Sequence, residues 1–214
     1  MFITLEGIEG SGKTTQIDNI VAFIQARGHA CVTTREPGGS SIGLQIRRIL
    51  LDPANGDLDP GAELMLYVAD RIQHLRTVIY PQLAAGKVVL CDRFFDATLV
   101  YQGYARGYDV GAIRTLHRLT CDDIQPDLTL LLDLPPQQGL DRAWERIHDN
   151  VDQDTRFEEE KLTFHQKVRD GYLDLARQAP ERFRLIDASK TQDQVAREIE
   201  AVLAPWLSAM EQNP

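Results

Sequence analysis

The feature that most constrains this chain is a glycine-rich segment near the N-terminus, where residues 7–14 read Gly-Ile-Glu-Gly-Ser-Gly-Lys-Thr. The spacing matches G-x-x-x-x-G-K-[ST], a pattern in which backbone N–H groups and a lysine surround phosphate oxygens. An apolar run at residues 2–5 precedes the segment, and apolar residues at helical spacing follow it. This context disfavours the alternative, a glycine-rich turn with a solvated lysine. We therefore expect a strand, a phosphate-binding loop and a helix in that order.

The residue types of this loop predict a nucleoside triphosphate bound with Mg²⁺. Glycine lets consecutive N–H groups turn toward one phosphate, and the N-terminus of the following helix adds partial positive charge. Lys13 would meet the β and γ phosphates, and the Thr14 hydroxyl would ligate the metal. The triphosphate site is therefore expected to consist of Gly7, Ile8, Glu9, Gly10, Ser11, Gly12, Lys13, Thr14 and Thr15.

Apolar runs that alternate with helical segments predict the fold class. Strands are expected at residues 2–5, 30–34, 87–91, 128–132 and 183–186. The third and fourth runs are almost continuously apolar, which is typical of parallel strands covered on both faces. Apolar residues recur at helical spacing between the runs, and Pro205 should kink or break the last helix. We expect an α/β fold with a five-stranded parallel sheet and helices on both faces.

The charge balance narrows the range of partners. The chain has 23 Lys and Arg against 32 Asp and Glu, a net charge of −9. Binding to a nucleic acid polymer or to an anionic membrane needs a positive field, so we expect neither partner. The odd number of cysteines, 3, without metal-ligand spacing, indicates reduced thiols in a cytoplasmic protein.

Missing motifs narrow the class of nucleotide-binding protein. Switch GTPases carry D-x-x-G and N-K-x-D segments, and transporter ATPases carry an L-S-G-G-Q-like segment. None of these strings occurs in the chain. The remaining class is a small kinase, which must hold a second substrate close to the γ-phosphate.

Three arginines mark the expected place of that substrate: two directly follow predicted strands, and one lies in a helical stretch. Asp92 and Arg93 follow the third strand and Arg35 follows the second, at the carboxyl edge where open α/β sheets bind ligands. An aspartate there can hold the water shell of Mg²⁺, and an arginine can clamp a phosphate. Asp70 and Arg71 lie in a helical stretch, where a surface ion pair is an equally good interpretation. The neighbouring His74 is interpreted as a solvated or core histidine.

Six segments, taken in order, resemble the thymidylate kinase family. They are G-x-E-G-x-G-K-T-T at 7–15, R-E-P-G-G at 35–39, F/Y-x-A-D-R-x-Q-H within 64–74, D-R-Y/F-x-D-x-x-x-x-Y-Q-G at 92–103, P-D-L-T-x-x-L-D-x-P-P at 126–136 and R-F/I-E at 156–158. The resemblance implies a P-loop kinase fold in which ATP phosphorylates dTMP to dTDP. It also implies one domain over residues 1–214, with a lid at about 142–157, and a homodimer. The apolar helix at 64–83 could supply the dimer interface or simply core.

The resemblance assigns a role to each residue of the dTMP site. Arg35 and Arg93 would hold the 5′-phosphate. Tyr67, where the family usually has Phe, would stack on thymine, and Arg71 would reach its O4 edge. The base and sugar would be lined by Thr98, Tyr101 and Gln102, with Tyr101 crowding the ribose 2′ position. Glu9 corresponds to the acidic residue near the 3′-hydroxyl and to a bacterial subtype in which the lid supplies an arginine.

The resemblance also assigns the catalytic group. Lys13, Arg93 and a lid arginine would stabilise the transferring phosphoryl group, while Thr14 and Asp92 hold Mg²⁺. We expect Arg146 to be the lid arginine, with Arg142 at the bound ATP and Arg156 as a further helper. Two departures stand out: Ala97 replaces a hydroxyl residue of the family, and residues 148–154 make a long acidic lid that could draw Arg156 away from the phosphates. A kinase for another nucleoside monophosphate and a non-catalytic nucleotide-binding regulator remain as alternatives.

Overall fold

The structure, a computed structural model, describes residues 1–149 and 155–212. Within this part of the chain, five parallel strands form one sheet in the order β2-β3-β1-β4-β5. The strands are β1 (Phe2–Glu6), β2 (Cys31–Arg35), β3 (Val88–Asp92), β4 (Leu128–Asp133) and β5 (Phe183–Asp187). The sequence-based prediction of a five-stranded parallel sheet is therefore confirmed, with bounds within one residue of those expected.

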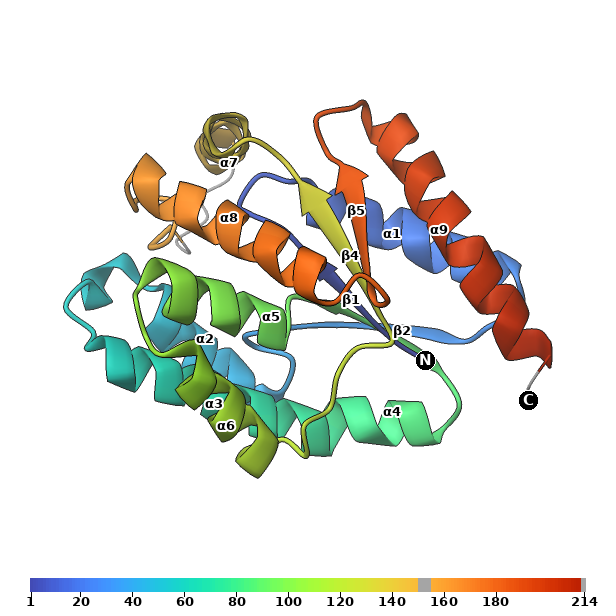
Figure 1. Cartoon of the computed structure of the whole chain (residues 1–214), viewed down its shortest axis with the longest axis horizontal. Coiled ribbons are helices and arrows are strands. Elements are labelled where there is room, and N and C mark those ends of the chain that lie inside the picture. Colours follow the sequence, from blue (N-terminus) through green and yellow to red (C-terminus); the bar gives the residue numbers. More distant parts are fainter. Residues whose placement is uncertain (150–154, 213–214) are drawn as a thin grey trace.

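Helices cover both faces of this sheet. Figure 1 shows α1 and α9 on one side and α3, α6 and α8 on the other. The helical segments are α1 (Lys13–Ala26), α2 (Ser41–Leu51), η1 (Pro53–Asn55), α3 (Pro60–His74), η2 (Leu75–Ile79), α4 (Tyr80–Ala84), α5 (Phe95–Thr98), η3 (Leu99–Ala105), α6 (Val110–Thr120), α7 (Pro136–Asp149), α8 (Leu162–Gln178) and α9 (Gln192–Gln212). No helix in the described ranges combines the length and apolar character that crossing a bilayer requires.

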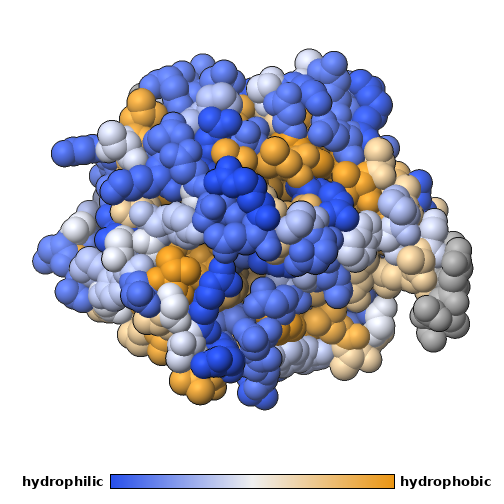
Figure 2. All heavy atoms as spheres, in the orientation of Figure 1, coloured by the Kyte–Doolittle hydropathy of each residue, from blue (hydrophilic) through white to orange (hydrophobic). Residues whose placement is uncertain are grey.

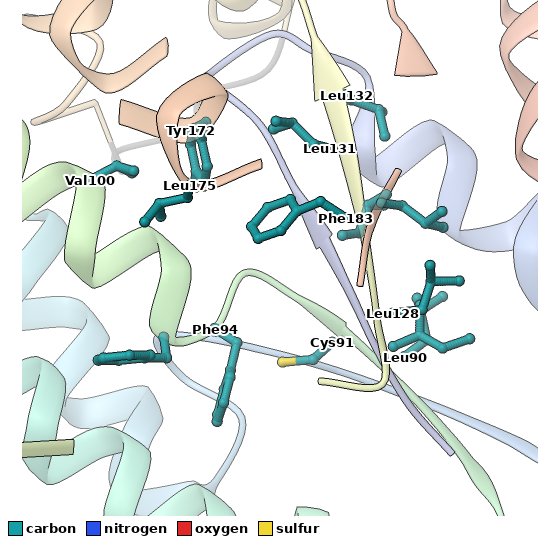
Figure 3. Close-up of a cluster of buried hydrophobic side chains, with 14 of the residues drawn as sticks. Leu90, Cys91, Phe94, Val100, Leu128, Leu131, Leu132, Tyr172, Leu175 and Phe183 are labelled. Atoms are coloured by element: carbon teal, nitrogen blue, oxygen red, sulfur yellow. The ribbon is translucent and has the colours of Figure 1, made fainter. Parts of the chain in front are cut away.

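The core lies between the central strands and the helices on either face. Ile3, Leu5, Leu90, Leu128 and Leu130 are fully buried, as expected of strands covered on both sides. Figure 3 shows the side chains of Leu131 and Phe183 on the side of the sheet where Tyr172 and Leu175 of α8 lie, and those of Leu90, Leu128 and Leu132 on the other side. Polar side chains dominate the face seen in Figure 2, with separate hydrophobic patches between them.

Helix α9 differs from the expectation in one respect. We expected Pro205 to kink or break this helix, and the structure shows that the helix is not broken there, because it continues through Pro205. Proline removes one backbone donor, but Leu203 and Leu207 on either side are fully buried. We attribute the continuity of the helix to this packing, which offsets the loss of one hydrogen bond.

Two π-helical segments, η2 and η3, follow α3 and α5 directly. π-Helical turns are rare in proteins, and those that occur often lie at functional sites. The residues of η3 include Tyr101 and Gln102, and both side chains are buried. Apolar spacing had no means of predicting this geometry, because it distinguishes helix from strand and not one helix type from another.

Candidate active site

The loop between β1 and α1 has the form that its sequence predicts. Gly10 and Gly12 adopt positive φ values of 68° and 89°, and α1 begins at Lys13. The Nζ atom of Lys13 donates to the carbonyl oxygens of Gly7 and Ile8, each at 2.9 Å. Burial, together with the nearby Arg93, lowers the pKa of Lys13 to about 8. The lysine is thus held at the centre of the loop and beside a second cation.

The helix that carries the predicted lid arginines starts directly on this loop. A Cβ atom added to Gly10 would overlap the carbonyl oxygen of Gly139, in the first turns of α7. A Cβ added to Gly139 would lie 2.5 Å from the carbonyl oxygen of Glu9. Only a pair of glycines allows the two backbones to approach so closely. Gly139 was not singled out from the sequence, since nothing around it indicates which segment it packs against.

Arg93 occupies the next position along the sheet edge, at the end of β3. Its φ of 65° is unusual for a residue with a side chain. Its guanidinium donates to Glu9 Oε1 at 2.8 Å and to the Tyr101 hydroxyl at 2.8 Å. Tyr101 in turn donates to the same oxygen of Glu9 at 2.6 Å. Burial by itself would raise the pKa of Glu9, but Arg93, His165 and Lys13 hold it well below its usual value. Glu9 is therefore a carboxylate at neutral pH.

A second buried carboxyl, Glu6, lies behind this cluster at the end of β1. It accepts hydrogen bonds from the backbone N–H of Phe94 at 2.8 Å and from the Tyr172 hydroxyl at 2.6 Å. Burial, with a contribution from the nearby Asp96, raises the pKa of Glu6 to about 7. Glu6 was not recognised from the sequence, where it is simply the residue that follows the first predicted strand.

Arg71 is not part of a surface ion pair with Asp70. Its side chain is 2% exposed and donates from Nε to Glu36 at 2.8 Å and from Nη2 to Thr98 at 2.8 Å. The other oxygen of Glu36 accepts from His74 Nδ1 at 2.9 Å. The functional interpretation of Arg71 thus gains support over the surface alternative, and His74 is a core histidine.

The C-terminal end of the expected lid is attached to α3. Glu63 accepts from Gln102 at 2.8 Å and pairs with Arg156 at 2.7 Å. Arg156 also donates to the carbonyl oxygen of Leu50 at 2.9 Å and is 8% exposed. Arg156 is therefore fixed against α2 and α3, which disfavours the hypothesis that it helps at the phosphates. Glu63 is a residue that the sequence analysis missed.

One cavity of about 920 Å³ joins these groups, a size typical of ligand pockets. Of the predicted site residues, it is lined by Glu9, Gly10, Ser11, Gly12, Lys13, Thr14, Thr15, Arg35, Tyr67, Arg71, Asp92, Arg93, Thr98, Tyr101, Gln102 and Arg142. Gly7 and Ile8 lie behind the loop and present their carbonyl oxygens to Lys13. The side chain of Arg146 and residues 150–154 lie outside the described part of the chain.

The cavity has lining residues that the sequence analysis did not single out. They are Arg47 of α2 and three residues that follow β5, Lys190, Thr191 and Gln192. Arg142 reaches the same region, because its Nη1 donates to the carbonyl oxygen of Ala188 at 3.0 Å. These residues share no motif with the phosphate-binding loop, so only the fold brings them to it.

The cavity also offers oxygen atoms suited to a metal ion. Thr14 and Asp92 both line it. The Oδ1 atom of Asp92 is buried and has no hydrogen-bond partner in the structure, which leaves a carboxylate oxygen without a donor. Mg²⁺ prefers such oxygens and takes its other ligands from water and phosphate. No cluster of three or more His, Cys, Asp or Glu side chains suited to a metal occurs in the described residues.

Comparisons with known proteins identify the family. The sequence profile of thymidylate kinase matches residues 5–199. The chain belongs to the thymidylate kinase family. It is 57% identical to a thymidylate kinase of Desulfosudis oleivorans over 205 residues, covering 95% of this chain and 96% of the relative. It is 55% identical to one of Syntrophotalea carbinolica over 199 residues, covering 92% of each.

A solved structure supports the same membership. The crystal structure of thymidylate kinase from Ehrlichia chaffeensis is 34% identical and superimposes with a TM-score of 0.72. The match covers 95% of this chain and 98% of the other. The fold is therefore the P-loop kinase fold of this family, as the sequence motifs predicted.

The raised pKa of Glu6 predicts a pH-dependent stability. The unfolded chain loses this proton near the ordinary pKa of 4.5, whereas the folded chain keeps it up to about pH 7. The loss of folding stability caused by ionising the buried Glu6 carboxyl is therefore absent below pH 4.5. It grows as the pH rises and reaches roughly 3 kcal/mol above pH 7. Glu6→Gln removes the charge, keeps an oxygen that accepts from the N–H of Phe94 and offers an amide N–H that can donate to the Tyr172 oxygen. We therefore expect it to exceed wild type in free energy of unfolding at pH 8 but not at pH 4.5. Urea denaturation of each protein at pH 8 and at pH 4.5 measures these free energies of unfolding.

Glu181→Gln, which removes an exposed carboxyl from the loop before β5, is the matched control and should follow wild type. If Glu6→Gln and wild type differ by the same amount at both pH values, the raised pKa is not the cause.

Proposed function

We propose that this thymidylate kinase transfers the γ-phosphoryl group of ATP to dTMP in the presence of Mg²⁺, giving dTDP and ADP. The observation that carries the proposal is the cavity of about 920 Å³. Its lining joins the phosphate-binding loop at Lys13 to the buried Arg71–Thr98 pair, with Arg93 between them. A donor phosphate at one end and a nucleoside monophosphate at the other would therefore meet at Arg93.

The donor would lie on the loop formed by residues 7–15. Its backbone N–H groups and Lys13 would hold the β and γ phosphates, and Arg142 would lie at the adenosine side. Thr14 and Asp92 would hold Mg²⁺ together with phosphate oxygens and water. The ion, when bound, neutralises charge on the transferring group and orients it. The unpartnered oxygen of Asp92 supports this assignment.

The acceptor would lie between β2, β3 and α3. Arg35 and Arg93 would hold its 5′-phosphate, and Tyr67 would stack on the base. Arg71, held rigid by Glu36 and Thr98, would present its remaining donors to the thymine edge. Thr98, Tyr101, Gln102 and Glu9 would line the base and sugar. The acceptor phosphate is already anionic near neutral pH, so the transfer requires no strong general base.

The lid would complete the site. Arg146 would approach the transferring phosphate once the lid excludes water, because a mobile cation stabilises spreading charge best in a dry site. Gly139 supports this role for α7, since it seats the helix on the loop that holds the phosphates. Residues 1–214 would act as one kinase domain with a lid at about 142–157. Three free cysteines support a cytoplasmic location.

The substrate assignment is tested by a coupled assay over nucleoside monophosphates. We expect turnover with dTMP to exceed turnover with AMP, CMP, GMP and UMP, because Arg71 and Tyr67 recognise thymine and Tyr101 crowds the 2′ position. Preference for another monophosphate would favour a kinase with a different base. Absence of product with every monophosphate would favour a non-catalytic nucleotide-binding regulator.

Lys13→Met tests the phosphate-binding role of the loop. The substitution keeps an unbranched side chain and removes the charge that Lys13 brings to the β and γ phosphates. We expect kcat to fall by about 10²-fold or more, the size of effect seen when a transition-state donor is lost. Lys167→Met is the matched control, since Lys167 is exposed on α8 and outside the cavity. Near-normal kcat for Lys13→Met would contradict the mechanism.

We propose that two copies associate through α2 and α3. These helices pack together and expose Ile42, Ile49 and Met65. Light scattering on the eluted protein should give twice the 24.1-kDa mass of the chain. Met65→Glu should shift the measured mass toward that of one chain, because a charge would have to be buried at the interface. Leu119→Glu, on α6, should leave the mass unchanged, and a wild-type monomer would contradict the proposal.

A further inference from the structure

The carboxylate of Glu9 is held at both of its oxygens, and one of the holding groups has no assigned role. Oε1 accepts from Arg93 at 2.8 Å and from Tyr101 at 2.6 Å. Oε2 faces the imidazole of His165, whose Nδ1 lies 3.2 Å away. Among the described residues Oε2 makes no hydrogen bond of good geometry, and His165 is the one group recorded at ion-pair distance from it. His165 is therefore the recorded contact that holds this side of the carboxylate.

His165 reaches the site only through Glu9. It lies in the first turn of α8, is 1% exposed and is not part of the cavity lining. Glu9, Arg93 and Tyr101, in contrast, all line the cavity. A substrate therefore meets Glu9 directly and cannot meet His165.

A bound substrate would affect the contacts at Oε1 and at Oε2 of Glu9 differently. Arg93 would turn to the phosphate of dTMP, and Tyr101 would face the sugar, so both contacts to Oε1 would weaken as the substrate binds. His165 is buried away from the substrate, so its contact with Oε2 would persist. A carboxylate on a flexible side chain that is fixed at only one oxygen can rotate, whereas a second contact fixes its plane. Groups behind a binding residue commonly orient it in this way.

We propose that His165 is a positioning residue that holds the Glu9 carboxylate in the orientation needed to bind the 3′-hydroxyl of dTMP. The proposal rests on the proposed function, in which Glu9 lies near that hydroxyl. His165 itself touches no substrate atom. Its effect is confined to substrates that carry a 3′-hydroxyl.

The test compares two nearly isosteric variants, His165→Asn and His165→Leu. The Asn amide nitrogen takes about the place of Nδ1, whereas Leu has the same shape and no donor. We measure kcat and KM with dTMP and with its 3′-deoxy analogue. His165→Leu should raise the KM for dTMP roughly tenfold, because the carboxylate that binds the 3′-hydroxyl loses the contact that orients it, and loss of such an orienting group costs on the order of tenfold. The KM for ATP should not change, and His165→Asn should restore most of the loss.

The analogue separates positioning from packing. Without the 3′-hydroxyl, His165→Leu and wild type should have the same KM, because Glu9 then has no partner to position. An equal loss with both substrates would mean that His165 only supports the fold, and would overturn the proposal. A wild-type KM for dTMP in His165→Leu, or failure of His165→Asn to restore it, would overturn it as well. If His165→Leu does not fold, His165→Phe keeps a ring without a donor and replaces it.

A third variant, Glu9→Gln, shows which assignment has failed. One outcome is that Glu9→Gln raises the KM for dTMP more than the KM for the 3′-deoxy analogue, while His165→Leu changes both by the same factor. The role of His165 is then wrong and that of Glu9 stands. If Glu9→Gln also changes both KM values by the same factor, Glu9 does not bind the 3′-hydroxyl, and the proposal falls with it. Turnover of dTMP by wild type remains the separate check on the proposed function.

Discussion

The ion pair between Arg93 and Glu9 is the interaction on which the site depends. Arg93 lies at the end of β3 and Glu9 in the loop after β1, so their contact joins the end of β3 to the phosphate-binding loop. Removing a buried charge from water is costly unless a partner of opposite sign and further hydrogen bonds compensate. Tyr101 and His165 contribute to this compensation. The arrangement keeps a cation beside Lys13 before any phosphate binds.

The same physical problem is solved a second time at Arg71, where we propose that thymine binds. Arg71 is buried at 2% exposure, and Glu36 provides its counter-charge while His74 fixes the other oxygen of Glu36. A guanidinium that already makes bonds to Glu36 and Thr98 loses little rotamer freedom when a base arrives. Both halves of the cavity therefore present preorganised cations, although the chain as a whole carries a net charge of −9.

Much of this arrangement could be predicted from the sequence, and its limits have identifiable causes. The five strands and the phosphate-binding loop are local patterns, since they depend on apolar runs and on glycine spacing within a few residues. Arg71 was recognised only through resemblance, because its neighbour Asp70 offered an equally plausible partner. Glu36, its actual partner, lies 35 positions away. Pro205 shows the reverse case: the local rule predicts a kink or a break, and the helix is not broken, which we attribute to the packing of Leu203 and Leu207.

The sequence by itself determined the chemistry of the site: a phosphate-binding loop, a set of arginines at the carboxyl edge of a parallel sheet, and the order of motifs that marks the family. Only the tertiary structure decided which groups face one another. Gly139 meets Gly10 across 129 positions, His165 meets Glu9 and Arg156 meets Glu63. These contacts depend on how helices α7, α8 and α3 pack around one sheet edge. Distances between residues far apart in the chain follow from that packing, and no local pattern of residues encodes them.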